Sequence, residues 1–256
     1  MPVRQKLIKV KEKLKNFVAD LVKAGDIDGL ELCLGNVTDT LSQLIRTAFI
    51  PSEGKIFAVC DFSAIEARVL AWAAGEDWVL DTFRNGGDIY CATASQMFGV
   101  PVQKHGQNAE LRQKGKIAVL ALGYGGNVGA LDAMGGQRMG LKEQEEIDIV
   151  SKYRAANPHI KQFWYNVQNA ALEVVEFPNR TVFVGPRGRS DADFFFYSVN
   201  GTLCCRLPSG RVLCYHNAQL TVNRFGGKSI KYQRLDQESR KWGWAETYGG
   251  KLVENI

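Results

Sequence analysis

The chain has 256 residues, of which 45% are hydrophobic and 23% are charged, an ordinary composition for a globular protein of one large or two small domains. The net charge of +5 mildly favours an anionic partner. The sequence has no apolar run of transmembrane length and no signal-peptide pattern, so we expect no membrane partner.

Residues 4–24 are basic and have a helical pattern. Two interpretations of this segment remain open, a solvated helix face and a contact with a DNA backbone. Gly25 is expected to end the helix, and a second helix is expected over residues 39–49, with Thr38 as its cap and Pro51 at its exit. The cations of the first segment are Arg4, Lys6, Lys9, Lys11, Lys13 and Lys15.

Residues 55–75 predict a strand followed by a helix. Five apolar residues, 56–60, end on Asp61, and a helix is expected from Ser63 to Gly75. A carboxylate after a buried strand needs a partner, which is either a divalent metal ion or the backbone N–H groups of the helix start. Ser63 and Glu66 also have the spacing of a capping box, which by itself accounts for both residues.

Residues 76–175 are predicted to be mostly helical, with boundaries at glycine and proline clusters. Within them, the segment RQKGKIAVLALGYGG repeats a spacing of four residues. At 100° per residue, positions four apart drift by only about 40°, so they form one stripe on a helix. The stripe consists of Arg112, Lys116, Leu120 and Tyr124, and Leu111, Gly115, Ala118 and Leu122 cluster on the opposite face.

The order of groups along this stripe suits a nucleoside triphosphate. The two cations can bind phosphates, the apolar residue can lie by the sugar, and the ring can lie by the base. The alternative is a solvated basic face, which does not account for Leu120 and Tyr124.

Residues 180–235 alternate β-forming residues with turn signals, which predicts an antiparallel sheet. The cysteines form no C-x-x-C pair and the three histidines lie far apart, so neither a zinc site nor a disulfide framework is expected. We expect reduced cysteines in the protein core and a cytoplasmic location. The six are Cys33, Cys60, Cys91, Cys204, Cys205 and Cys214.

Taken together, these motifs resemble those of the family A DNA polymerases, in the form carried by many bacteriophages. The first family motif, D-x-S-x-x-E-x-R, is matched by Asp61, Ser63, Glu66 and Arg68. The second, R-x-x-x-K followed by an aromatic residue and Y-G, is matched by Arg112, Lys116, Tyr124 and Gly125. The phage form adds LSQLIRTAFIP, ASQMFGVP, RLPSGR and ETYGGKLVENI, and the resemblance runs from about Leu21 to Ile256.

The resemblance implies an α/β fold, the helical fingers and a truncated palm of a right-hand polymerase, the palm being an antiparallel sheet with helices. Residues 1–54 would be a helical segment leading into the palm, and residues 55–75 the palm strand and helix with the first motif. Residues 76–175 would be the fingers, with the second motif at 112–125. Residues 176–256 would be a β-rich palm segment.

The resemblance also implies the chemistry. The primer 3′-hydroxyl attacks the α-phosphate of a dNTP and pyrophosphate leaves, with two Mg²⁺ ions as cofactors and primer–template DNA as partner. Asp61 would bind both ions and the carbonyl of Phe62 one of them. Lys116 would also protonate the pyrophosphate, and Glu66 would exclude a ribose 2′-hydroxyl.

Further residues acquire expected roles from the same resemblance. Arg112 and Lys116 would hold the triphosphate, with Tyr90 beside it where many relatives carry His, and Tyr124 would lie by the templating position. Leu120 stands where the family usually has Phe or Tyr. Contacts to DNA are expected from Arg68, Gly125, Lys251, Glu254 and Asn255.

The third family motif, H-D-E, does not occur in these 256 residues. We therefore expect a partial polymerase chain, inactive alone, to which a complementary fragment could supply that motif, in the host cytoplasm if a phage encodes it. Two alternatives stay open. One is a non-catalytic remnant that binds DNA or nucleotide, and the other is a palm of the single-subunit RNA polymerase type, against which Glu66 argues.

Overall fold

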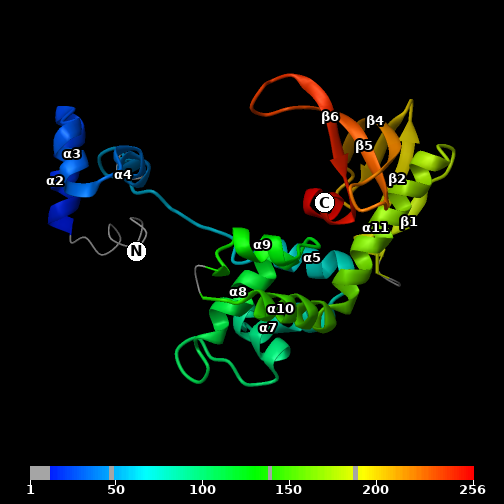
Figure 1. The fold of residues 1–256 in the computed structure, drawn as a ribbon, viewed down its shortest axis with the longest axis horizontal. Coiled ribbons are helices and arrows are strands. Elements are labelled where there is room, and N and C mark those ends of the chain that lie inside the picture. The colour runs from blue at the N-terminus through cyan, green and yellow to red at the C-terminus, as the bar shows by residue number, and fades with distance from the viewer. Residues whose placement is uncertain (1–11, 46–48, 138–139, 187–189) are drawn as a thin grey trace. The chain divides into compact units, whose positions relative to one another are not determined.

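Helices account for the regular structure of the N-terminal part of the chain. The computed structural model describes residues 12–45, 49–137, 140–186 and 190–256, and the chain divides into two units, Met1–Asp61 and Phe62–Ile256. In the first unit the described helices are α2 (Glu12–Ala24), α3 (Ile27–Leu34) and α4 (Val37–Leu44) (Figure 1).

The helix ends of the first unit agree only in part with the predictions. Gly25 follows α2 with φ +68°, a left-handed conformation that glycine adopts without strain, so it ends this helix as predicted. Helix α4 begins two residues before the predicted start, because Asn36 rather than Thr38 is its cap and accepts a hydrogen bond from the Asp39 N–H at 3.0 Å. The basic residues before Glu12 lie outside the described residues.

The strand predicted at residues 56–60 is wrong. Residues 55–62 have no helix or strand assignment, and Ile56 and Val59 are each 89% exposed. A strand exists only where neighbouring segments take its N–H and C=O groups, and an apolar run does not provide those neighbours. Asp61 and Phe62 therefore lie in an exposed, irregular segment.

The second unit combines helices with one sheet, which confirms the predicted α/β class. Its helices are α5 (Ile65–Ala74), α6 (Asp77–Arg84), α7 (Ile89–Phe98), α8 (Leu111–Leu122), α9 (Val128–Ala133), α10 (Glu143–Ala156), α11 (Pro158–Glu176) and α12 (Gly249–Asn255), with a 3₁₀ turn at Ser190–Ala192. Its strands are β1 (Val182–Val184), β2 (Phe194–Val199), β3 (Thr202–Arg206), β4 (Val212–Val222), β5 (Lys228–Leu235) and β6 (Trp242–Thr247).

The predicted antiparallel sheet is confirmed and extends further than expected. All neighbouring strands are antiparallel in the simple order β1 to β6, and the last strand ends at Thr247 rather than near residue 235. Helix α11 runs along one face of the sheet (Figure 1). Phe163 and Val167 of this helix join Phe194, Phe196 and Leu203 of the strands in one hydrophobic core.

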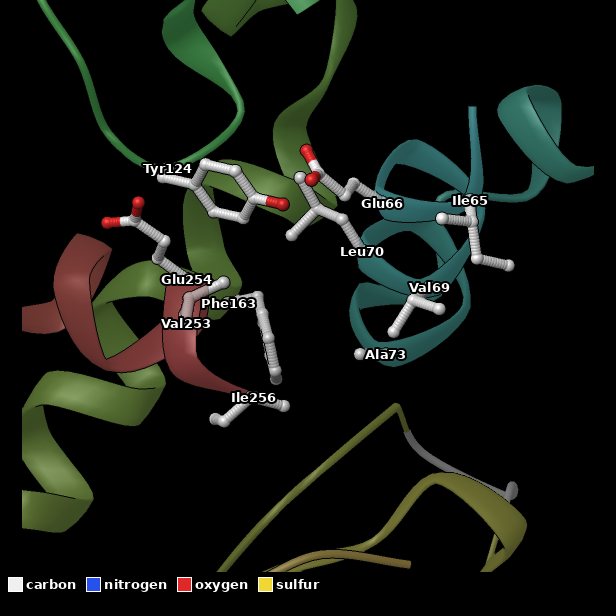
Figure 2. Close-up of a pocket in the computed structure, with 10 residues that line it drawn as sticks. All are labelled: Ile65, Glu66, Val69, Leu70, Ala73, Tyr124, Phe163, Val253, Glu254 and Ile256. Carbon is white, nitrogen blue, oxygen red and sulfur yellow. The ribbon is translucent and has the colours of Figure 1, made fainter. Parts of the chain in front are cut away.

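A second core holds the helices α7 to α10 together. It contains Ile117, Ala118 and Leu122 of α8 with Leu131 of α9 and Ile149 of α10. In the first core, Leu70 of α5, Phe163 of α11 and Val253 of α12 line a cavity (Figure 2). The described helices include none long and apolar enough to cross a membrane.

Helix α5 does not begin with the capping box predicted from Ser63 and Glu66. Its N-cap is Ala64, which makes no side-chain cap bond and has φ +50°, and Glu66 is the second residue of the helix. The left-handed Ala64 changes the register between the two residues, so the motif spacing does not place them as cap and third residue. The end of the helix at Gly75 is as predicted.

The prediction that all cysteines lie in the core is wrong for half of them. Cys33, Cys60 and Cys214 are exposed, whereas Cys91, Cys204 and Cys205 are buried, and all six are free thiols. Cys60 is exposed because the expected strand is absent, and Cys214 because it lies on the outer face of the sheet.

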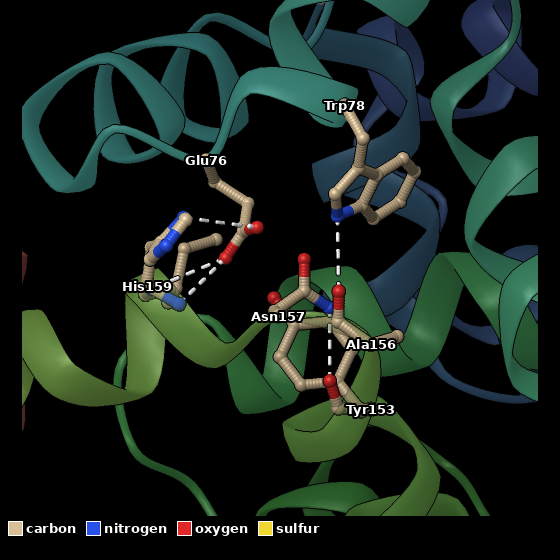
Figure 3. Close-up of polar contacts among 7 residues, drawn as sticks. Glu76, Trp78, Tyr153, Ala156, Asn157 and His159 are labelled. Atoms are coloured by element: carbon tan, nitrogen blue, oxygen red, sulfur yellow. Dashed lines mark hydrogen bonds and ion pairs between the residues drawn. The ribbon is translucent and has the colours of Figure 1, made fainter.

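A buried carboxylate, Glu76, connects the segment before helices α6 to α10 with the start of α11, the helix that packs on the sheet (Figure 3). Glu76 is 3% exposed, and its Oε2 accepts hydrogen bonds from the backbone N–H groups of His159 (2.9 Å) and Ile160 (3.2 Å) at the start of α11. Nearby, the Trp78 indole donates to the Ala156 carbonyl at 3.0 Å. The two chain segments that enter and leave the helical group are thereby joined side by side.

We predict that Glu76→Ala lowers the free energy of unfolding by about 1–3 kcal/mol, because two N–H groups lose their acceptor. Glu76→Gln should stay within about 1 kcal/mol of wild type, since an amide oxygen can accept both bonds. Urea denaturation of the three proteins checks this. Equal losses for Ala and Gln would show that the charge, not the hydrogen bonding, stabilises the junction.

The same carboxyl group gives an expected pH dependence. Burial raises the pKa of Glu76 above 4.5, against the opposing effect of its N–H donors and His159. The native state therefore binds more protons than the unfolded state above pH 4.5, and this contribution to stability is lost as the pH rises through the folded pKa. Glu76→Gln should lower the slope of stability against pH in that interval.

Candidate functional site

Helix α8 presents one buried and one accessible face, as its sequence predicts. Gly115, Ala118 and Leu122 are buried, and Leu111 is half-buried. The stripe on the other face is helical through Leu120, which is 37% exposed. Tyr124 lies two residues beyond the helix end, in the following turn, so the predicted helical stripe is correct only for its first three members.

Gly115 allows α7 and α8 to pack backbone against backbone. A Cβ atom at this position would lie 2.2 Å from the Tyr90 carbonyl oxygen and 3.0 Å from the Ala94 Cβ, distances that no real side chain adopts. The missing side chain therefore brings the first turn of α7 against the middle of α8.

This packing gathers a group that we call the Tyr90 cluster, consisting of Asp88, Tyr90, Arg112 and Lys116. The Arg112 guanidinium carbon lies 5.3 Å from the Tyr90 ring centroid and the Lys116 Nζ lies 6.0 Å from it, both within cation–π range. The two cations of α8 and the phenol of α7 thus lie together at a partly exposed site.

Asp88 organises this cluster and was missed by the sequence analysis. As the N-cap of α7 it accepts hydrogen bonds from the N–H groups of Tyr90 and Cys91, while Arg112 donates to it from Nε at 2.8 Å and pairs with it through Nη2 at 2.8 Å. Burial alone would raise the pKa of Asp88, but Arg112 and the N–H donors lower it overall. The Gly-Gly-Asp sequence before an apolar helix was the available signal.

At the other end of α8, Tyr124 meets two carboxylates. Burial, together with the charges of Glu66 on α5 and Glu254 on α12, raises the pKa of Tyr124 to about 12. The turn after α8, which carries Tyr124, is held to α11 by a hydrogen bond that the Trp164 indole donates to the Gly123 carbonyl at 2.7 Å. Figure 2 shows Tyr124, Glu66 and Glu254 around one opening.

Two cavities adjoin these three side chains. An apolar one of about 190 Å³ lies beneath them, lined by Leu70, Phe163 and Val253 among others. A polar one of about 560 Å³ lies on the side of the sheet and α12. Its remaining lining residues include Tyr232, Arg234, Lys251 and Asn255. Glu66, Tyr124 and Glu254 line both cavities.

The remaining predicted site residues are placed as follows. Arg68 turns back along α5, donating from Nε to the Ser63 carbonyl at 3.0 Å and covering the Phe83 ring. Lys251 and Glu254 are exposed on α12, and Asn255 donates to the Tyr215 hydroxyl at 3.0 Å. Gly125 has φ +76° in the turn after α8. DNA contacts by these residues stay predictions.

The expected magnesium site is not assembled in the described residues. Within them, no three His, Cys, Asp or Glu side chains gather as metal ligands. Asp61 is exposed in its irregular segment, and a two-metal site needs carboxylates on more than one side. The described residues thus do not fit a complete Mg²⁺ site, and the metal roles of Asp61 and Phe62 stay predictions.

Comparison with known proteins gives consistent matches. The family model "DNA polymerase family A" matches residues 17–180. A DNA polymerase of Bacillus phage SP02 is 47% identical over 98% of this chain. DNA polymerase I of Geobacillus stearothermophilus is 33% identical over 61% of the chain, and the thermostable DNA polymerase I of Thermus aquaticus is 32% identical over 49%. The chain spans 39%, 18% and 14% of these three relatives.

The glycine contact between α7 and α8 yields a prediction with an internal control. Gly115→Ala should destabilise the protein by about 1–3 kcal/mol or more, because the added methyl group overlaps the Tyr90 carbonyl. Gly129→Ala on α9 adds the same methyl group where nothing lies within 4 Å, and it should be neutral or stabilising by up to about 1 kcal/mol. Thermal denaturation of both variants checks this. Equal effects would mean that α7 and α8 can separate without cost.

Proposed function

Because the chain belongs to DNA polymerase family A, we propose that it forms the nucleotide-binding and template-binding part of an enzyme that synthesises DNA on a template. The observation that carries this proposal is the arrangement along α8. Two cations, Arg112 and Lys116, lie beside Tyr90 at one end, and Tyr124 lies near Glu66 at the other. The accessible face from Arg112 to Leu120 spans two helical turns, about 12 Å.

In this proposal Arg112 and Lys116 bind the triphosphate of the incoming dNTP. Asp88 uses only part of the five N–H donors of Arg112, so it can hold the guanidinium in place while other donors face a phosphate. Lys116 carries a compact charge and would also donate a proton to the leaving pyrophosphate. Leu120 contacts the sugar, and Tyr90 lines the phosphate side.

Glu66 would exclude the ribose 2′-hydroxyl and Tyr124 would stack beside the templating base. Their nearness, indicated by the effect of Glu66 on the Tyr124 pKa, supports a common position at the base and sugar end of the nucleotide. The polar cavity with Arg234 and Lys251 is the proposed place for the end of the primer–template duplex, with Arg68, Gly125, Glu254 and Asn255 as further contacts.

The nucleotidyl transfer itself is proposed for the whole polymerase of which this chain is a part. Two magnesium ions are expected to support it, and a complementary fragment with the third motif is expected to complete the site. A nucleotide-binding remnant without turnover is the second candidate, favoured by the lack of a gathered carboxylate site in the described residues.

Nucleotide binding can be tested without turnover. We expect Lys116→Ala to weaken dNTP binding by about 1.5–3 kcal/mol, the scale of a charge-assisted hydrogen bond. Lys114→Ala is the matched control, because Lys114 lies on the same helix but pairs with Glu145 at 3.7 Å. Calorimetry with dNTP compares the two. Equal affinities in wild type and Lys116→Ala would leave the stripe as a solvated basic face.

Sugar choice is the second test. Glu66→Ala should narrow the difference between dNTP and rNTP affinity, because it opens space for a hydroxyl group. Glu66 makes no cap hydrogen bond at the start of α5, so loss of a capping box does not complicate the variant. Glu66→Gln, of similar size, should keep the preference. An unchanged ratio in Glu66→Ala would mean that Glu66 is structural and that another residue excludes the 2′-hydroxyl.

Turnover is the third test. We expect residues 1–256 alone, with magnesium and a primed template, to extend the primer several orders of magnitude more slowly than an intact family member, since metal charge stabilisation is worth several kcal/mol. Robust extension that Asp61→Ala abolishes would contradict this expectation and would mean that other carboxylates complete the site.

A further inference from the structure

A pair of cysteines faces each other across two strands of the sheet. Cys204 on β3 and Cys214 on β4 are directly opposite in the antiparallel register. The next pair, Cys205 and Leu213, points into the core beneath the sheet. Because side chains alternate between faces, Cys204 and Cys214 share the outer face.

The hydrogen-bond pattern of this hairpin puts the two cysteines in the type of cross-strand pair that has the shorter Cα–Cα distance. Near the turn, the Leu207 N–H donates to the Arg211 carbonyl at 2.8 Å, which makes Leu207 and Arg211 a hydrogen-bonded pair. Pairs alternate along an antiparallel ladder, so Cys204 and Cys214 form a non-hydrogen-bonded pair. In such pairs the Cα atoms are about 4.5 Å apart, within the range of about 4.4–6.8 Å that disulfides adopt.

We propose that Cys204 and Cys214 form a redox site that a peroxide converts to a cross-strand disulfide. This inference does not rest on the proposed function. The exposed Cys214 thiol reacts first, giving a sulfenic acid and an alcohol or water from the peroxide. The Cys204 sulfur then displaces the sulfenic oxygen, forming the S–S bond and releasing water.

The two cysteines differ as this sequence of steps requires. Cys214 is exposed and accessible to the oxidant, whereas Cys204 is buried beside Tyr197 of β2, which lies opposite it. Burial raises the pKa of Cys204 to about 11, so it is a neutral thiol held in place next to its partner rather than a competing target of the peroxide.

The disulfide would lie beside Tyr215, which contacts a residue of the candidate site, Asn255. Tyr215 follows Cys214, packs its ring on Tyr232 and accepts the hydrogen bond from Asn255 on α12. Oxidation would therefore fix the hairpin at the point where the sheet supports α12. The cross-link would also close a short loop of the unfolded chain, which stabilises the native state.

The test treats the full chain with hydrogen peroxide and digests it with trypsin without reduction. Trypsin cleaves after Arg206 and Arg211, between the two cysteines, so only a disulfide keeps the two peptides together. We expect the linked species in wild type and in the control Cys33→Ser, its disappearance on reduction, and at least a tenfold loss in Cys204→Ser and Cys214→Ser.

The melting temperature of the oxidised wild type is a second measurement, which tests the proposal even if a cysteine variant folds poorly. Oxidation should raise the melting temperature of the wild type by about 5–10 °C, and this shift should be absent after reduction and in Cys204→Ser. Oxygen adducts on Cys214 without the linked peptides would overturn the proposal. So would a linkage that persists in Cys204→Ser, since it would come from Cys205.

Discussion

The hydrogen bonds of Glu76 to the start of α11 join the chain segment that follows α5 to the first turn of α11, where the chain enters and leaves helices α6 to α10 of the second unit. One core belongs to helices α7 to α10, and the other to α11 and the sheet. Tyr124 follows α8 of the first group but packs against the core of α11 and the sheet, as do the helices that carry Glu66 and Glu254. The Glu76 bonds and the bond from the Trp164 indole to the Gly123 carbonyl thus both help to hold the segments that carry these three side chains together.

The helix of the second motif could be predicted from sequence because its signal is local. A spacing of four residues fixes which side chains share a face, and the burial of Ala118 and Leu122 follows from it. The Tyr90 cluster was harder to predict from sequence. It depends on the absence of a side chain at Gly115 and on Asp88, the N-cap of another helix. Family resemblance pointed to Tyr90 but not to the residue that orients Arg112.

The errors concern features that local sequence does not determine. An apolar run ending on Asp61 has the composition of a buried strand, yet strands need partners supplied by distant segments. The capping-box spacing of Ser63 and Glu66 was present, but the backbone turn at Ala64 prevents it. The cross-strand pairing of Cys204 with Cys214 was equally unpredictable from sequence, because the strand register determines it and no cysteine motif indicates it.

Ala64 has one more consequence, for the mutability of this region. An alanine in the left-handed conformation costs roughly 1–2 kcal/mol relative to the right-handed one, and here it lies two residues before Glu66. Glycine at this position would relieve that strain, whereas a β-branched residue would increase it. Laboratory evolution aimed at the proposed sugar contact of Glu66 would therefore find a stabilising substitution two residues before it, and could use that substitution to offset the cost of altering Glu66.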